Sequence, residues 1–168
     1  ITKPGGVVVW VVGDATINGS ETGTSFRQAL YFKDVCGFKL HDTMIYKKKA
    51  MKFPDTNRYY QAFEYMFVFS KGTPKTVNLI RDRRNLCFGN AIYGSDRQKD
   101  GTFKERRKGK IVQKLGVRFN IWEYPTGWGK SARDEIAFQH PAIFPEQLAA
   151  DHIISWSNPG DIVLDPMC

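Results

Sequence analysis

The segment Val7–Val12, with the sequence VVVWVV, restricts the fold more than any other part of the chain. Five of its six residues are valine, and none is polar. A continuous β-branched apolar run of this length is typical of a strand buried on both faces, as in a parallel sheet covered by helices. The segment therefore predicts an α/β fold.

Three further segments extend this layer. Residues 25–35 predict a helix with a broken apolar face, and Gly37 is placed to end it in the left-handed conformation. Residues 41–47 (HDTMIYK) and 65–70 (YMFVFS) predict two strands. We expect these two strands to form an antiparallel hairpin at the edge of the sheet.

The middle of the chain, residues 73–139, has no apolar period that persists for more than one turn. Its one candidate helix is 104–115 (KERRKGKIVQKL), which contains Gly109. An irregular stretch of this length is uncommon inside a compact domain unless it carries a function. We therefore predict a first segment at 1–72, an inserted region at 73–139, and a return to the first domain at 140–168.

The end of the chain regains regular patterns, and Pro145 opens a predicted helix. The residues that recur there at helical spacing are Leu148, His152, Ile153 and Trp156. Residues 158–160 (NPG) end the helix, and 161–164 (DIVL) predict a short buried strand. Because a buried strand does not normally finish a domain, we expect the chain to be a fragment.

Charge is distributed unevenly along the chain. The formal net charge is +8, yet residues 71–118 alone carry 14 basic and 4 acidic side chains. A local excess of this size indicates either a solvated loop or a surface for a polyanion, and both stay open. The cations predicted to contact nucleic acid are Arg97, Lys99, Lys104, Arg106, Arg107, Lys108, Lys110, Lys114 and Arg118.

Residues 53–60 (FPDTNRYY) combine aromatic and basic side chains. Two interpretations stay open: stacking on a base, with Arg58 and Tyr59 as DNA contacts, or packing across a sheet edge. Asp14, His140 and Asp165, taken alone, are each explained as turn or capping groups.

The sequence excludes several classes of protein. It holds no Gly-x-Ser-x-Gly, phosphate-loop or His-Glu-x-x-His motif. Its three widely spaced cysteines argue against a disulfide framework or structural metal and favour a reduced cytoplasm. No apolar run is long enough to span a membrane, and the first residues form no signal-peptide pattern. We expect a cytoplasmic protein without a membrane partner.

Three stretches of the sequence together resemble a known family. They are GGVVVWVVGDATINGSETGTSFRQAL, YMFVFSKG and HPAIFPEQLAADHIISWSNPGDIVLDPMC, with the basic region before the last. This order is similar to that of the amino-group DNA methyltransferases, in the permuted group whose catalytic half precedes the cofactor half. The resemblance implies methyl transfer from S-adenosylmethionine to the exocyclic amino group of a flipped base in double-stranded DNA. It also implies an incomplete Rossmann-like sheet, with 73–139 as an irregular inserted target-recognition region.

The resemblance also implies roles for individual residues. Those matched to the segment at the methionine end of the cofactor are His140, Pro141, Ala142, Ile143, Phe144 and Pro145. Those matched to the start of the cofactor loop are Asp165, Pro166, Met167 and Cys168. Residues 13–24 and 53–60 are implied to flank the entry of the flipped base.

The chain departs from the family pattern at both ends. The catalytic tetrapeptide (Asp, Asn or Ser, then Pro-Pro, then an aromatic residue) is absent, and so is the glycine loop after Asp165. We therefore assign no catalytic residue in this chain and expect the fragment to be inactive alone. We also expect it to be only marginally stable, because a family strand would be missing between Val7–Val12 and 161–164.

The parent protein is expected to be a DNA methyltransferase of the restriction-modification kind, with adenine favoured over cytosine. One alternative is a non-enzymatic basic DNA-binding module, or a decayed methyltransferase of a phage or mobile element. Another is a different nucleotide-binding α/β enzyme. The sequence gives no prediction of oligomeric state.

Overall fold

The computed structural model describes residues 2–49, 56–106, 109–127, 129–139 and 143–166. The chain divides into two units. The first unit takes in Ile1–Asn78 and Asn120–Cys168, and the second is Leu79–Phe119. The second unit falls inside the inserted region at 73–139, whose role in target recognition stays a prediction.

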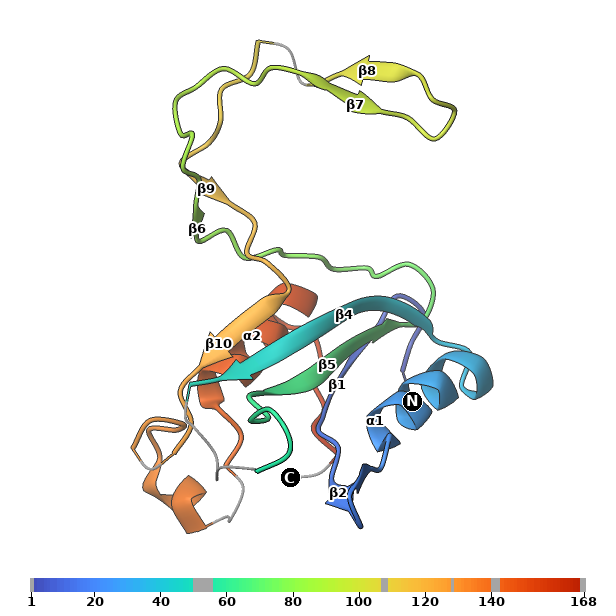
Figure 1. Cartoon of the computed structure of the whole chain (residues 1–168), viewed down its shortest axis with the longest axis vertical. Helices are drawn as coiled ribbons and strands as arrows, with labels where there is room; N and C mark the ends of the chain where they lie inside the picture. Colours follow the sequence, from blue (N-terminus) through green and yellow to red (C-terminus); the bar gives the residue numbers. More distant parts are fainter. Residues whose placement is uncertain (1, 50–55, 107–108, 128, 140–142, 167–168) are drawn as a thin grey trace. The chain divides into compact units, whose positions relative to one another are not determined.

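The first unit is built on a four-stranded sheet with the order β1-β5-β4-β10 (Figure 1). The strands are β1 (Val7–Val12), β5 (Phe63–Ser70), β4 (Lys39–Lys48) and β10 (Ile121–Tyr124). β5 is antiparallel to both β1 and β4, whereas β10 is parallel to β4. The strands predicted at 7–12, 41–47 and 65–70 are confirmed, and so is the antiparallel pairing of the last two.

Two expectations about this sheet are wrong. The β4–β5 hairpin lies at the centre of the sheet and not at its edge, because β1 pairs with β5 and β10 pairs with β4. β1 itself is antiparallel to β5 and has no second neighbour among the described residues. Its six residues are only half-buried, since an edge strand leaves one flank of its backbone open.

Helix α1 covers one face of the sheet. It spans Thr24–Leu30 and continues into a π-helical turn, Tyr31–Val35, so the helix predicted at 25–35 is confirmed. Gly37 follows with φ of 72°, the left-handed conformation that was predicted to end the helix. The core between helix and sheet consists of Ala29, Phe67 and Phe69, with Val8, Trp10, Val12, Phe32, Phe38 and Tyr65 packed against them.

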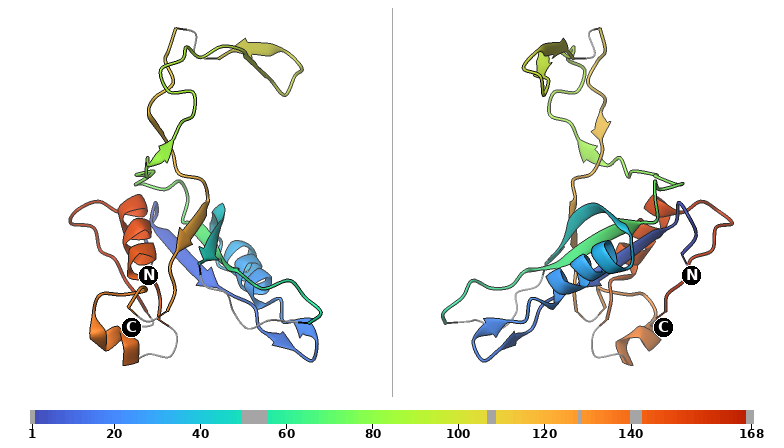
Figure 2. Two further views of the ribbon diagram at one scale, coloured as in Figure 1. Left: turned by 60° about the vertical axis from the view of Figure 1, so that its left-hand side comes forward. Right: turned by 90° about the vertical axis from the view of Figure 1, so that its right-hand side faces the viewer.

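Helix α2, Glu146–Trp156, covers the opposite face of the sheet (Figure 2). Leu148 and His152 are buried there, as their helical spacing predicted. Ile153 is 44% exposed, because it lies 100° around the helix from His152. Pro145 is the residue that caps the helix and not its first helical residue. With a helix on each face, the first unit is a layered structure of mixed α and β content. The mostly parallel sheet expected of an α/β fold is not found among the described strands, because β5 runs antiparallel to both of its neighbours.

The segment 161–164 does not form the predicted buried strand, and Ile162 is 90% exposed. No neighbouring strand among the described residues offers these backbone groups a partner, so they stay open to water. The turn before the segment does form, because the N–H of Asp161 donates to the carbonyl of Asn158 at 3.0 Å.

The second unit is a two-stranded arm. Its paired segments are β6 (Arg83–Arg84) with β9 (Leu115–Gly116), and β7 (Ser95–Arg97) with β8 (Phe103–Glu105). The helix predicted at 104–115 is wrong for the part that the structure describes. Backbone N–H groups of Asn85, Gly89 and Ile92 donate to carbonyls of residues 110–114, and Gly109 has a φ of 77°. This pairing replaces the hydrogen bonds that a helix would make.

A small hairpin, β2 (Thr16–Ile17) with β3 (Ser20–Glu21), and a 3₁₀ helix, Glu135–Gln139, complete the regular structure of the described residues. Within these residues no helix is long and apolar enough to cross a membrane. The same ranges contain no group of three or more side chains suited to a metal ion.

Candidate functional site

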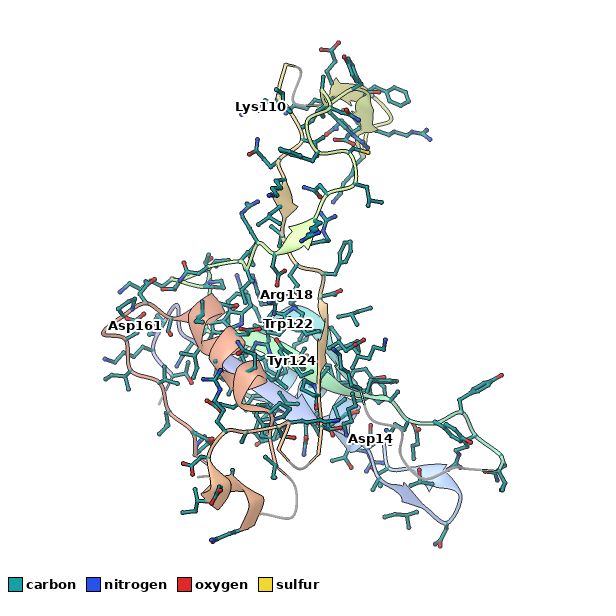
Figure 3. All side chains as sticks on the ribbon, turned by 90° about the vertical axis from the view of Figure 1, so that its left-hand side faces the viewer. Asp14, Lys110, Arg118, Trp122, Tyr124 and Asp161 are labelled. Atoms are coloured by element: carbon teal, nitrogen blue, oxygen red, sulfur yellow. The ribbon has the colours of Figure 1, made fainter. Side chains whose placement is uncertain are left out.

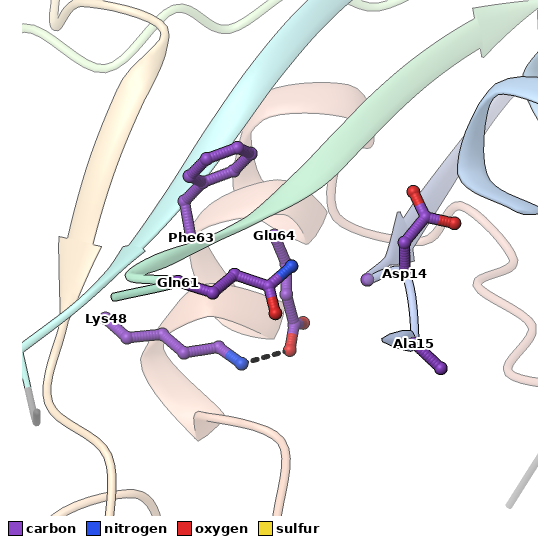
Figure 4. A pocket seen from close by; sticks show the side chains of 7 residues that line it. Asp14, Ala15, Lys48, Gln61, Phe63 and Glu64 are labelled. Atoms are coloured by element: carbon purple, nitrogen blue, oxygen red, sulfur yellow. Dashed lines mark hydrogen bonds and ion pairs between the residues drawn. The ribbon is translucent and has the colours of Figure 1, made fainter. Parts of the chain in front are cut away.

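A hollow of about 270 Å³ lies where β1 and β4 end and β5 begins (Figure 4). The residues that line it are Gly13, Asp14, Ala15, Lys48, Gln61, Phe63 and Glu64. Residues 13–15 follow β1 directly, and Lys48 is the last residue of β4. In sheets with helices on both faces, ligands bind beyond the carboxyl ends of the strands, so this hollow is the candidate site.

The hollow is polar on one side. Lys48 and Glu64 form an ion pair there, with side chains 11% and 28% exposed. Gly13 lets Glu64 approach closely, since a Cβ built at Gly13 would lie 3.3 Å from Glu64 Cγ. Burial, together with the charge of Glu64, raises the pKa of the nearby Tyr46 to about 12. The Tyr46 hydroxyl therefore stays protonated, and it has no hydrogen-bond partner within the described residues.

Asp14 is a capping residue, as the sequence indicated. Its carboxylate accepts the Ser25 N–H at 3.0 Å and the Thr22 hydroxyl at 3.1 Å, and also the hydroxyl of Ser25. The Ser25 hydroxyl is the main reason that the pKa of Asp14 lies below its usual value. The charged carboxylate thus holds the start of α1 against the end of β1, at the rim of the hollow.

The two segments implied to flank base entry do meet in the structure. A second hollow of about 170 Å³ adjoins the first, and its lining includes Asp14, Glu21, Tyr59 and Tyr60. Tyr59 is fully exposed, whereas the guanidinium of Arg58 donates to the carbonyl of Gly19 in the β2–β3 turn. Residues 53–55 lie outside the described residues. The DNA contacts of Arg58 and Tyr59 stay predictions.

The predicted cofactor residues are described only in part. Ile143 is half-buried, Phe144 is 45% exposed, and Pro145 is buried where α2 begins. Asp165 and Pro166 are exposed. The remaining predicted cofactor residues lie outside the described residues: His140, Pro141, Ala142, Met167 and Cys168. Their cofactor role stays a prediction.

Sequence reasoning missed a buried polar cluster between α2 and β10, whose Tyr124 is labelled in Figure 3. The Tyr124 hydroxyl donates to Asp151 Oδ2 at 2.6 Å, and Gln147 Nε2 donates to Asp151 Oδ1 at 2.7 Å. Asp151 is only 5% exposed. Its neighbour His152 lies 4.6 Å from the Trp122 ring, and burial lowers its pKa to about 4. Helical spacing indicated His152, but it gave no signal for Tyr124, Gln147 or Asp151.

The predicted cations between 97 and 118 all lie within the arm, Leu79–Phe119. Arg97, Lys99, Lys104, Lys110 and Lys114 are exposed, whereas Arg107 and Lys108 lie outside the described residues. Two of the predicted contacts are paired with acids. Arg106 Nε lies 2.6 Å from Asp96, and Arg118 Nε donates to Asp82 at 2.9 Å.

Three arginines of the arm were not in the predicted set: Arg81, Arg83 and Arg84. The guanidinium of Arg83 lies 4.6 Å from the centre of the Phe119 ring, and its Nε donates to the carbonyl of Val117 at 3.0 Å. The signal for them was the run RDRR at 81–84. With them, the arm holds 12 basic and 4 acidic residues, a net +8 that equals the net charge of the chain.

Comparison with known proteins identifies the family of the chain. A family model described as DNA methylase, N6_N4_Mtase, matches residues 1–168. The chain is 63% identical to an orphan methyltransferase of Bacillus amyloliquefaciens, M.BamHII, over 99% of this chain and 63% of that protein. The chain thus spans less than two thirds of the length of this relative.

A solved structure shares the fold. It is the PvuII DNA methyltransferase (cytosine-N4-specific), with a TM-score of 0.61 and 20% sequence identity. The likeness covers 95% of this chain and 50% of that one. The resemblance seen in the sequence is therefore confirmed, and because the family model matches its whole length, the chain belongs to the N6/N4 DNA methylase family.

Proposed function

We propose that this chain is part of an enzyme that transfers a methyl group from S-adenosylmethionine to the exocyclic amino group of a base in double-stranded DNA. Membership of the DNA methylase family supports the reaction class and the methyl donor. The observation that carries the proposal is the polar hollow at the carboxyl ends of β1 and β4, which adjoins exposed tyrosines.

The hollow offers the groups that a base turned out of the helix requires. Such a base is held by hydrogen bonds to its polar edge and by stacking on aromatic side chains. Lys48 and Glu64 supply a donor and an acceptor, and Phe63 and Tyr60 supply rings in the same two hollows. We propose that the base enters between the β2–β3 hairpin and Tyr59.

The described part of the predicted cofactor segments fits S-adenosylmethionine. Phe144 presents a half-exposed ring next to the buried Pro145, and Asp165 presents an exposed carboxyl group. A ring of this kind suits the adenine or the methionine chain, and a carboxylate suits the ribose hydroxyls. The cofactor would supply the methyl group, and these residues would hold it.

We propose that the arm Leu79–Phe119 belongs to a target-recognition region, and that the first unit is part of a Rossmann-like sheet. Support for the first point is the charge of the arm, which suits a polyanion. The preference for adenine has no support in the structure or the comparisons, so adenine and cytosine are equal candidates for the methylated base. The non-enzymatic DNA-binding alternative is kept, because this chain contains no Pro-Pro tetrapeptide.

The test uses the complete open reading frame that contains this chain. The purified protein is incubated with DNA and labelled S-adenosylmethionine, and the DNA is digested to nucleosides, which identifies N6-methyladenine or N4-methylcytosine. We expect one of the two. Glu64→Gln is expected to lower methyl transfer more than DNA binding. DNA binding without transfer, in a protein that carries the tetrapeptide, would refute the proposal and favour the binding module.

A further inference from the structure

The arm Leu79–Phe119 exposes large apolar side chains along its length. Leu86, Tyr93 and Phe103 are all more than two-thirds exposed. A two-stranded ribbon has no second layer to cover such side chains and is marginally stable at best alone. Of these side chains, Phe103 lies in β8 and is available to contact a partner of the hairpin.

The charge of the arm identifies the class of partner. Its net charge of +8 is that of the whole chain, so the remaining residues carry as many acids as bases. Arg97, Lys99, Lys104, Lys110 and Lys114 are exposed and form no ion pair with any described acid. Unpaired cations at this density suit a polyanion, and each phosphate contact adds affinity through release of counterions.

The turn of the β7–β8 hairpin is defined by hydrogen bonds and by one left-handed residue. In its turn, Gln98 N–H donates to the carbonyl of Thr102 at 2.7 Å. Asp100 Oδ1 accepts both the N–H and the hydroxyl of Thr102, at 3.0 and 2.7 Å. Gly101 supplies the left-handed residue that the turn needs, with φ of 85°.

The register of the hairpin puts Arg97 and Phe103 side by side. Arg97 is directly opposite Phe103, and residues opposite each other in an antiparallel pair share a face. Asp96 is opposite Lys104 on the other face and pairs there with Arg106. One face therefore carries the guanidinium of Arg97 and the ring of Phe103, with Ser95 and Glu105 opposite each other at its far end. The other face carries Lys104 and the Asp96–Arg106 ion pair.

We propose that the β7–β8 hairpin enters the major groove of double-stranded DNA as a two-stranded ribbon, with Arg97 and Phe103 reading base edges. The inference rests on the proposed function for its DNA substrate. The major groove admits a two-stranded ribbon, arginine pairs with the O6 and N7 of guanine, and an apolar side chain contacts the thymine methyl. Lys110 and Lys114, which are compact point charges, contact phosphates instead.

The test again uses the complete open reading frame, and its readout is binding to a randomised duplex library followed by sequencing. Arg97→Lys keeps the positive charge but removes the bidentate hydrogen bonding of the guanidinium to guanine O6 and N7. We expect the preference at one base pair to fall about 5- to 150-fold, with the salt dependence of binding unchanged. Phe103→Ala is expected to relax an adjacent position. Both side chains are exposed, and circular dichroism checks that the variants stay folded.

Lys110→Ala with Lys114→Ala is the matched control. We expect it to weaken binding to all duplexes equally and to reduce the salt slope by about 1.8, without changing the preferred sequence. The inference would be overturned if Arg97→Lys and Phe103→Ala left the preferred DNA sequence unchanged. It would also be overturned if the double lysine variant changed the preferred DNA sequence. Equal binding to an RNA duplex would also overturn it, because the major groove of RNA is too narrow for side chains to read.

Methyl transfer is scored separately on the same preparations. Sequence-specific binding that depends on Arg97, without any methyl transfer by the wild-type protein, refutes the proposed function and leaves the hairpin inference standing. Methyl transfer by the wild-type protein, with a DNA sequence preference that Arg97→Lys does not change, supports the proposed function and overturns the hairpin inference.

Discussion

Lowering the pH from 7.5 to 5 is expected to destabilise the first unit through His152. The imidazole is 6% exposed, packs 4.6 Å from the Trp122 ring, and has Nε2 3.3 Å from the sulfur of Met66. The Trp156 indole N–H approaches Nδ1 at 3.4 Å, an arrangement that requires this nitrogen to be unprotonated. Burial lowers the pKa of His152 to about 4, and the smaller effect of Asp151 acts in the opposite direction.

The size of the effect follows from the two pKa values. In the unfolded chain the imidazole titrates near its ordinary pKa of 6.5, and in the folded chain at about 4. Above pH 6.5 both states are neutral and His152 contributes no pH dependence. Below pH 6.5 the unfolded state takes up a proton that the folded state does not, so stability falls. The loss reaches about 2 kcal/mol at pH 5 and levels off at about 3 kcal/mol below pH 4.

The assay is urea unfolding of the protein from the complete open reading frame that contains this chain, at pH 7.5 and pH 5, followed by far-ultraviolet circular dichroism. His152→Gln removes the titrating group at nearly constant volume. We expect the wild type to lose about 2 kcal/mol more than the variant between the two pH values, whatever their difference at pH 7.5. Equal losses in the two proteins would refute the reasoning, because the pH dependence would then come from other groups.

Three further substitutions test the packing and the hollow by the same unfolding assay. Leu148→Ala removes a fully buried side chain and should lower the free energy of unfolding by about 3–5 kcal/mol. Ile153→Ala, on the exposed side of α2, should lower it by under about 1 kcal/mol, and equal losses would contradict the placement of α2. Tyr46→Phe removes a buried hydroxyl without a partner among the described residues, and should leave stability unchanged or raise it by about 1 kcal/mol; a loss would reveal a partner. Asp14→Ala removes the acceptor at the start of α1 and should cost about 1–2 kcal/mol, and no cost would contradict its capping role.

The layered part of the fold was predictable because its signals are local. The valines of β1 and the spacing of Leu148 and His152 each report one element without reference to the rest of the chain. Sheet order is not local. β10 pairs with β4 across more than 70 residues, and this pairing, together with that of β1 with β5, puts the hairpin at the centre of the sheet.

The candidate hollow had no signal in the residues taken alone, which indicated only a capping role for Asp14. The family resemblance implied that residues 13–24 and 53–60 lie beside each other, and Asp14 and the described part of the second segment do line adjoining hollows. The sequence did not predict the Lys48–Glu64 ion pair or the hydrogen bonds of Asp151. Each depends on two side chains from different elements, and a charged residue within a strand or helix usually indicates an exposed surface.

The arm shows why an irregular sequence is not an unstructured one. Its strands are two or three residues long, and Arg83 pairs with Gly116, 33 positions along the chain, so no apolar period can develop. The arm also has no apolar interior to impose one, since Leu86, Tyr93 and Phe103 face solvent. Two signals are nevertheless present in its sequence: the basic residues between 97 and 118, and the turn-forming residues Asp100 and Gly101. The turn residues suit a hairpin, whereas the charge alone suits either a polyanion or a solvated loop, the two interpretations that the sequence left open.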